Sequence, residues 1–373
     1  CISNQSMQLL HRRDWLKKSS MAGLGFMVPQ ITLAAGSNQY RTANTLIRLT
    51  SNENPYGPSP MARKAMAEAI TSSNRYPWDV TTQLREKLGE QYGLTKDHVL
   101  MGAGSSEILG LVAQLAALEK GNAITADPSF SIWVTSAQKM GLEIIKVPLS
   151  HDKKLELDKM LSKLDSNTRL FYICNPNNPT GTVLPFEKIK QVAEDASKKS
   201  LVLIDEAYIE YAGQPSQVSL VNHNKNIIIA KTFSKIHGLA GGRIGYALAH
   251  PDTIRQLGTL QPWINAGTSA VSLAAALASM QDKTFISNSK EWNKAAGDLT
   301  QKELTALGLT VIPSSTNFIY YSLGKYNGNW QENLRAKNVL SGRIVEPIGQ
   351  WTRTTIGTME EMKQFIAAAR SIV

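Results

Sequence analysis

Two apolar runs, LVLID at residues 201–205 and IIIAK at residues 227–231, decide the fold of this chain. Neither run alternates between polar and apolar positions, as a strand with one solvent-exposed face would. Aliphatic runs of this length are typical of strands in a parallel sheet that is covered on both faces. We therefore expect both runs to be buried strands, each with a charged residue at its carboxyl end.

Strand-like and helix-like segments alternate around these runs. Helical patterns occupy residues 105–118, 132–140 and 186–198, and strand patterns occupy residues 123–126, 143–148 and 169–174. This alternation predicts an α/β fold with crossover helices on both faces of the sheet. In such sheets, ligands bind beyond the carboxyl ends of the strands.

The pattern changes after residue 264. An Ala/Ser-rich helix starts near residue 266 and is expected to run on towards residue 306. Short strands and a terminal helix follow, which is an α+β arrangement and predicts a second, smaller domain. We therefore expect a large domain over residues 76–275, and a small domain made of residues 40–75 together with 276–373.

Composition excludes several classes of protein. The 373 residues are 42% hydrophobic and 19% charged, which excludes disorder, collagen and coiled coil. The two cysteines, Cys1 and Cys174, cannot form a disulfide scaffold, and no apolar run approaches the length of a membrane span. The net charge of +10 is spread along the chain without a basic block, so we expect no nucleic-acid partner. No metal site is predicted.

Residues 1–36 are predicted to be a targeting leader. The string RRDWLKK at residues 12–18 precedes a weakly apolar, Gly-containing stretch and the small residues LAAG at 33–36. This layout resembles a twin-arginine signal, which exports folded proteins, so we expect a periplasmic location. The alternative is a cytoplasmic protein with a basic arm. The chain begins with Cys1, and Met7 is a plausible start.

Polar motifs follow several of the expected strands and turns. They are GAGSSE at 102–107, NPNNPTGT at 175–182, DEAY at 205–208, KTFSK at 231–235 and GLAGGR at 238–243. An Asp and a Lys at the ends of buried strands are costly unless they are paired. Their position beside Gly- and Ser-rich turns suggests that they share an anionic ligand.

These motifs resemble the fold-type I aminotransferases that use pyridoxal 5'-phosphate (PLP), in the branch that includes histidinol-phosphate aminotransferase. The resemblance covers residues 46–365 and also includes NENPYGP at 52–58, RYP at 75–77 and RTTIGT at 353–358. The spacing is compatible with that family, with 27 residues from Asn178 to Asp205, 30 more to Lys235 and 8 more to Arg243. The resemblance implies a large domain with a mostly parallel sheet, a smaller α+β domain, PLP as cofactor and a homodimer.

The resemblance assigns the catalytic roles. Lys235 would bind PLP covalently and then move the α-proton of the substrate. Asp205 would face the ring nitrogen and keep it protonated, so that the ring withdraws electrons. Tyr208 and Asn178 would bond the phenolic oxygen of PLP. The alternatives are a turn residue for Asn178 and a core tyrosine for Tyr208.

The resemblance also assigns a phosphate site. Ser105 and Ser106 open a helix, whose free amides and dipole favour an anion. Thr232 and Ser234 would add hydroxyls, and Arg243 would add a bidentate positive charge. Helix capping without a ligand is the alternative for the two serines.

Further residues are assigned to the ring and to the neighbouring subunit. Phe130 matches the aromatic residue that stacks on the PLP ring, with a plain core residue as the alternative. Tyr76 matches a tyrosine that reaches the phosphate bound by the neighbouring subunit, which implies composite active sites in a homodimer.

Substrate binding is expected at four residues. Arg353 matches the arginine that holds the α-carboxylate, which a planar guanidinium binds in a two-pronged manner. Asn178 would contact the same substrate, and Tyr56 and Trp351 are candidates for the side-chain pocket. His237 lies close in sequence to the catalytic lysine, but we interpret it as structural.

The sequence departs from the histidinol-phosphate enzymes at one position. Those enzymes usually carry arginine in a pattern like IVRP, whereas residues 343–347 here read RIVEP, with Glu346 in its place. A glutamate is expected to repel a phosphate and to favour a neutral or cationic side chain. Arg343 is an alternative source of positive charge.

We therefore expect a transaminase that takes an amino group from an amino acid with an apolar, aromatic or basic side chain and gives it to a 2-oxo acid. The alternatives are another PLP reaction on this scaffold (decarboxylase, racemase or lyase), a true histidinol-phosphate aminotransferase, and a catalytically dead binding protein. Arg353 favours transamination, because a carboxylate that is held in place tends to lie in the ring plane and is not lost.

Overall fold

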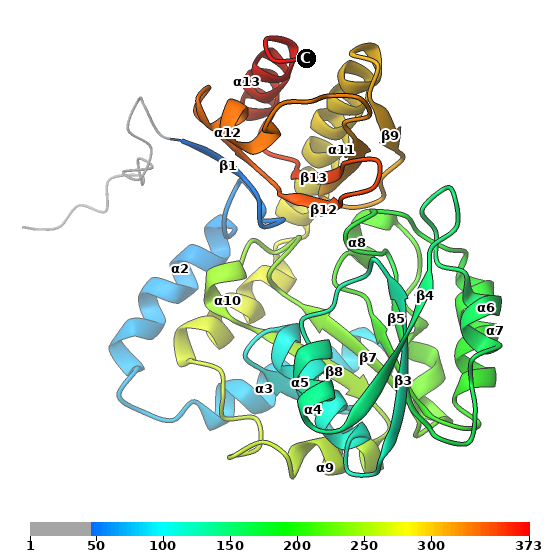
Figure 1. Ribbon diagram of the computed structural model, residues 1–373. Coiled ribbons are helices and arrows are strands. Elements are labelled where there is room, and N and C mark those ends of the chain that lie inside the picture. Colours follow the sequence, from blue (N-terminus) through cyan, green and yellow to red (C-terminus); the bar gives the residue numbers. More distant parts are fainter. Residues whose placement is uncertain (1–45) are drawn as a thin grey trace, which may run out of the picture. The chain divides into compact units, whose positions relative to one another are not determined.

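The computed structural model describes residues 46–373; the predicted leader and Cys1 lie outside the described residues. A seven-stranded sheet contains the two apolar runs (Figure 1). Its strands are β2 (Val99–Gly102), β3 (Gly121–Asp127), β4 (Leu142–Pro148), β5 (Thr168–Cys174), β6 (Leu201–Asp205), β7 (Ile227–Thr232) and β8 (Gly245–Ala249). Their order across the sheet is β2-β8-β7-β6-β5-β3-β4. The strand β8 pairs antiparallel with both β2 and β7, and all other pairs are parallel, so the prediction of a mostly parallel α/β sheet is confirmed.

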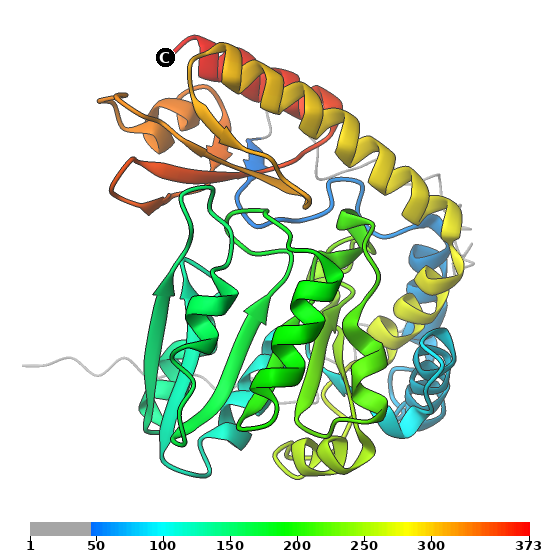
Figure 2. The same cartoon turned by 90° about the vertical axis from the view of Figure 1, so that its right-hand side faces the viewer.

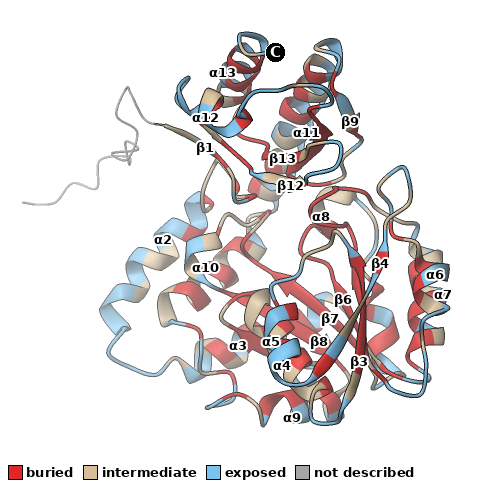
Figure 3. Ribbon diagram, in the orientation of Figure 1, coloured by how far each residue is buried: buried red, intermediate tan, exposed pale blue. Residues whose placement is uncertain are grey.

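Each face of this sheet is covered by helices, which explains why its strands lack alternation. On one face lie α4 (Ser105–Ala116), α5 (Val134–Lys139) and α9 (Pro251–Gly258); on the other lie α2 (Pro60–Ala69), α3 (Trp78–Gln91), α6 (Leu157–Leu161), α7 (Phe186–Ala196) and α10 (Ala270–Gln281). Successive residues of β6 point to opposite faces, so Leu203 packs in one apolar cluster and Ile204 in the other. The strands β2, β7 and β8 are buried along their whole length, whereas the edge strand β4 is partly exposed (Figure 3).

A second, four-stranded antiparallel sheet has the order β12-β13-β10-β9. Its strands are β9 (Thr310–Ile312), β10 (Phe318–Ser322), β12 (Ile344–Glu346) and β13 (Trp351–Thr355). The helices of this part are α11 (Lys283–Ala306), α12 (Trp330–Arg335) and α13 (Met359–Arg370), and a parallel pair is formed by β1 (Ile47–Leu49) and β11 (Val339–Ser341). Figure 2 shows α11 running from this smaller sheet towards α10 beside the larger one.

The expected long helix is divided into α10 and α11. Asp282 separates them, and its carboxylate accepts a hydrogen bond of 3.1 Å from the backbone N–H of Phe285. This N-cap starts a new helix in a different direction, which the Ala/Ser-rich composition did not reveal.

The boundaries of the two predicted domains stay a prediction. The segment assigned to the small domain at 40–75 contains β1, which pairs with β11, and also α2, which packs on α10. The α2 residue Ala62 belongs to the core under the seven-stranded sheet. Within residues 46–373, the helices are all too short or too polar to cross a bilayer.

Candidate active site

A cavity of about 300 Å³ opens at the carboxyl ends of β5, β6 and β7, between the two sheets. Its lining includes all of the predicted cofactor and substrate residues except Tyr56, Tyr76 and Trp351. Those that line it are Ser105, Ser106, Phe130, Asn178, Asp205, Tyr208, Thr232, Ser234, Lys235, Arg243 and Arg353. The structure thus brings together motifs that are spread over about 250 residues of sequence, as expected for ligand sites in open α/β sheets.

Lys235 places its amine in this cavity just after β7. The ammonium donates to the backbone oxygen of Asn52 at 3.1 Å, and it lies 5.4 Å from the ring centre of Tyr208. Burial, followed by the positive charge of Arg353, lowers the pKa of Lys235 to about 8. A substantial fraction of this amine is therefore neutral near physiological pH and available as a nucleophile.

Asp205 lies buried at the carboxyl end of β6. Tyr172 Oη donates to one carboxylate oxygen at 3.0 Å, and the backbone N–H of Ala207 donates to the other at 3.1 Å. Burial raises the pKa of Asp205 to about 6, although both hydrogen bonds oppose this change. Within residues 46–373, no cationic side chain lies within 4 Å of this carboxylate, so it can accept a cation from a ligand. Sequence reasoning missed Tyr172, which lies inside a strand and has no motif.

A hydrogen-bonded network joins the substrate end of the cavity to Tyr208. Asn52 Nδ2 donates to Tyr208 Oη at 2.9 Å, and Asn178 Nδ2 approaches the same oxygen at 3.4 Å. Arg353 donates to Asn178 Oδ1 at 2.6 Å and to the backbone oxygen of Thr50 at 2.9 Å. Asn52 was not predicted as a site residue, although it begins the NENPYGP motif and has a positive φ of 54°.

The predicted phosphate end lies at the N-terminus of α4. Arg243 donates to Ser106 Oγ at 2.9 Å, and Ser105 is the first residue of the helix. Gly104 precedes it with φ of 84°, and a Cβ there would lie 2.4 Å from Nη2 of Arg243. Only glycine therefore lets the arginine approach this helix end.

The hydroxyls of Thr232 and Ser234 complete this end of the cavity. Thr232 Oγ1 donates to Ser234 Oγ at 2.9 Å, so the two hydroxyl groups lie side by side. At Gly245 a Cβ would lie 2.4 Å from the amide nitrogen of Ser105, which keeps the helix end close to the sheet. Free helix amides, hydroxyls and a guanidinium are the groups that bind a phosphate dianion.

Tyr76 lies apart from the cavity. It is 69% exposed and forms an aromatic cluster with Trp78 and Trp263, at ring-centre distances of 5.5 and 5.2 Å. In this single chain the side chain does not reach the phosphate end.

The two candidates for the side-chain pocket also lie outside the cavity. Tyr56 packs on Trp292 with ring centres 4.4 Å apart. Trp351 stacks on Tyr320 at 5.2 Å, and Lys153 Nζ lies 4.5 Å from the Trp351 ring.

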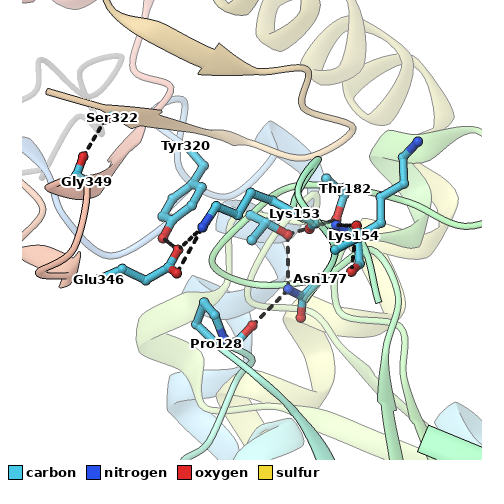
Figure 4. A network of polar contacts seen from close by, with 11 residues as sticks. Pro128, Lys153, Lys154, Asn177, Thr182, Tyr320, Ser322, Glu346 and Gly349 are labelled. Atoms are coloured by element: carbon cyan, nitrogen blue, oxygen red, sulfur yellow. Dashed lines mark hydrogen bonds and ion pairs between the residues drawn. The ribbon is translucent and has the colours of Figure 1, made fainter. Parts of the chain in front are cut away.

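The structure changes the interpretation of Glu346. Lys153 Nζ donates to both carboxylate oxygens at 2.9 Å, and Tyr320 Oη donates to one of them at 2.5 Å (Figure 4). Glu346 lines neither the first cavity nor an adjoining one of about 710 Å³. Lys153 pairs with this charge, and the expectation that Glu346 disfavours a phosphate stays a prediction. The adjoining cavity is lined by Arg343 as well as Arg353.

Sequence comparison identifies the family of this chain. Residues 44–368 match the family model for class I and II aminotransferases. The chain belongs to this family. Histidinol-phosphate aminotransferase of Halalkalibacterium halodurans is 33% identical over 334 residues, which is 88% of this chain and 89% of that protein.

Solved structures of other aminotransferases share the fold. Histidinol-phosphate aminotransferase from Sinorhizobium meliloti, in complex with PLP, has a TM-score of 0.78 and 25% identity, over 95% of this chain and 100% of that one. The L-threonine-O-3-phosphate decarboxylase from Porphyromonas gingivalis has a TM-score of 0.75 and 21% identity, over 87% and 98% of the two chains, so the fold alone does not specify the reaction.

The protein is a PLP-dependent transaminase. The predicted family, fold type and cofactor are thereby confirmed. The lining of the cavity fits PLP: it combines a buried carboxylate that has no cationic side chain of residues 46–373 within 4 Å, a cluster of groups suited to a phosphate, and a lysine amine.

Proposed function

We propose that this transaminase moves an amino group from an amino acid to a 2-oxo acid, with Lys235 as the group that handles the proton. The observation that carries the proposal is the position of the Lys235 amine in one cavity with Asp205 and Arg353. When bound there, PLP supplies the electron withdrawal that makes the α-proton of the substrate acidic. The residues of the chain then hold the substrate and move that proton.

Arg353 would bind the substrate α-carboxylate. Its guanidinium points into the cavity and already bonds two oxygens, Asn178 Oδ1 and the Thr50 carbonyl, so its orientation is fixed before a ligand arrives. A carboxylate held by a fixed planar group leaves the Cα–H bond as the one that breaks. Lys235 would take that proton, since its pKa of about 8 suits a general base near neutral pH.

Asp205 and Tyr208 would adjust the cofactor from two sides. The Asp205 carboxylate would hold a proton on the ring nitrogen, which raises electron withdrawal by the ring. Asn52 donates to Tyr208 Oη at 2.9 Å, and this bond orients the hydroxyl group in the cavity. Phe130 lines the cavity and would cover the ring.

We also propose that the preferred donor is not histidinol phosphate. The position where the histidinol-phosphate enzymes usually have an arginine carries Glu346, so this position supplies no positive charge for a substrate phosphate. The second candidate is histidinol phosphate itself. It is favoured by Arg343, which lines the adjoining cavity together with Arg353, and by the names of the relatives.

The test is a screen of the PLP-loaded protein against the twenty amino acids and histidinol phosphate, with release of the carbonyl product as the readout: a 2-oxo acid from an amino acid and a ketone from histidinol phosphate. We expect 2-oxo acid from at least one amino acid and none from the Lys235→Ala variant. Release of carbon dioxide in place of 2-oxo acid would identify a decarboxylase and overturn the proposal. Faster turnover of histidinol phosphate than of any amino acid would overturn the choice of donor.

We propose that the active form is a homodimer with composite sites. Tyr76, Trp78 and Trp263 form an exposed aromatic cluster, which a single chain leaves in contact with water. Light scattering should give twice the chain mass. Mixing Tyr76→Phe with Lys235→Ala subunits should restore part of the activity that each variant lacks, because one composite site regains both residues.

We propose export through the twin-arginine route. The proposal rests on the RRDWLKK string, which lies outside the described residues. Fusing residues 1–45 to a reporter that is active only when it is exported in a folded state should give a periplasmic signal. Replacement of Arg12 and Arg13 by lysine should abolish the signal, and an unchanged signal would contradict the proposal.

A further inference from the structure

Lys153 occupies a backbone position that suits glycine better than lysine. Its φ is 60°, in the left-handed region, within a turn in which its amide donates to Ser150 O at 3.0 Å. A residue with a side chain adopts this conformation at some cost, and such positions persist where surrounding contacts enforce them. The contacts of the Lys153 side chain and carbonyl are therefore expected to hold the residue in this conformation.

The side chain of Lys153 extends from this turn to the four-stranded sheet. Its ammonium bonds both carboxylate oxygens of Glu346 at 2.9 Å and lies 4.5 Å from the ring centre of Trp351. The Lys153 and Glu346 side chains are only 15% and 25% exposed. An ion pair that is largely removed from water, with two hydrogen bonds and an aromatic neighbour, holds a more fixed geometry than an exposed pair.

Glu346 and Arg353 share one face of this sheet. Glu346 lies opposite Trp351 in the β12–β13 register, and Tyr320 lies opposite Arg353 in the β10–β13 register. Opposite residues of antiparallel strands, and residues two apart on one strand, point to the same side. The stack of Trp351 on Tyr320 therefore connects the ion pair to the strand position of Arg353.

The backbone of Lys153 bonds to the loop that carries Asn178, a partner of Arg353. Its carbonyl accepts a hydrogen bond of 2.9 Å from Thr182 Oγ1 (Figure 4). Thr182 ends the loop 175–182 that presents Asn178, and Asn178 Oδ1 accepts from Arg353 at 2.6 Å. One residue is thus bonded to the loop through its carbonyl and to the sheet through its ammonium.

We propose that Lys153 is a positioning residue for the carboxylate site. Its ion pair with Glu346 fixes the four-stranded sheet against the loop 175–182, and this fixes Arg353 against Asn178. The inference rests on the proposed role of Arg353 in holding the substrate carboxylate. It gives Glu346 a function in place of the arginine expected there: the carboxylate anchors the ammonium that aligns the site.

The test compares Lys153→Met with Lys154→Met in the PLP-loaded protein. Lys154 is the adjacent residue, but its ammonium pairs with Asp152 at 2.8 Å on the exposed side, so it is a matched control. Propionate serves as a probe that carries only a carboxylate, and its dissociation constant is measured by calorimetry. We expect Lys153→Met to weaken propionate binding and raise the KM of the amino donor about tenfold. In Lys153→Met, kcat and PLP affinity should change less than about twofold. In Lys154→Met, propionate binding and KM should also change less than about twofold.

Two further variants distinguish positioning from a general loss of packing. Glu346→Gln keeps the volume of the side chain, and it should weaken propionate binding by about the same factor as Lys153→Met. The exchange variant Lys153→Glu with Glu346→Lys restores an ion pair, so propionate affinity should recover in part, as a double-mutant cycle would register.

Each outcome decides the inference. Equal propionate affinity in Lys153→Met and Lys154→Met would overturn it, and so would a parallel loss of PLP affinity and melting temperature, which indicates a merely structural role. If the wild-type protein transfers no amino group but its propionate binding depends on Lys153, the proposed function fails and the positioning role stands.

Discussion

Replacing Lys231 by methionine tests the buried charges behind the active-site strands. Lys231 lies in β7 with its side chain 3% exposed, and its ammonium is 2.9 Å from Glu210 and 3.4 Å from Glu206. Burial alone would lower the pKa of Lys231, but Glu210, Tyr92 and Glu206 raise it above its ordinary value. The ammonium therefore stays charged in the folded protein.

The expected cost is large because the variant leaves the Glu206 carboxylate buried without its cation. Breaking a buried ion pair by removing one partner costs about 3–5 kcal/mol. In the wild type, the contribution of the raised Lys231 pKa is complete below the ordinary lysine value of about 10.4 and is lost only above it, so stability is independent of this group from pH 5 to 9.

The assay is urea unfolding of the cofactor-free protein at pH 5.5 and pH 8, followed by circular dichroism and tryptophan fluorescence. We expect Lys231→Met to lose about 3–5 kcal/mol of unfolding free energy at both pH values, because the wild-type ammonium is charged at each of them. Lys302→Met changes an exposed lysine on α11 and should shift stability by less than about 0.5 kcal/mol. A loss below about 1 kcal/mol for Lys231→Met at either pH would refute the reasoning.

Three other outcomes follow from the site and the core. Arg353→Lys should raise the KM of the amino donor about 100-fold in steady-state kinetics with PLP affinity unchanged, since an ammonium cannot bind a carboxylate in a two-pronged manner; an unchanged KM would contradict the role of Arg353. The rate of PLP uptake by the cofactor-free protein, measured by stopped-flow absorbance, should rise with pH through about 8, because only the neutral Lys235 amine attacks an aldehyde; a flat profile would contradict this. Cys174 is buried and its thiol pKa is raised by burial, so in a Cys1→Ser chain a thiol reagent should react only after unfolding.

The sequence predicted the larger sheet well because its strands are apolar on both faces. The β6 strand was placed without error, and the ends of α4 and α7 were placed to within two residues. The β8 strand was missed, since Gly245–Ala249 follows a Gly-rich segment and contains no β-branched residue. It is inserted antiparallel between β2 and β7, a pairing that only long-range contacts specify.

The motifs predicted most residues of the candidate site, but two residues that contact them were missed. Tyr172 and Asn52 contact Asp205 and Tyr208, but a tyrosine inside a strand and an asparagine at a turn have no signature of their own. The partner of Glu346 could not be inferred either, because Lys153 lies 193 residues earlier in the chain.

The sequence by itself determined which segments are buried, where strands alternate with helices, and which polar residues end the strands. Those properties are local, because they depend on apolar periodicity and on residues that follow one another. Only the tertiary structure decided which charges meet. Arg353 bonds the carbonyl of Thr50, 303 residues away, and Glu346 is neutralised by a lysine from another part of the fold. A glutamate is written the same way in the sequence whether or not its carboxylate is paired with a cation. The difference depends on the distance from the carboxylate to the nearest cation, which only the tertiary structure sets.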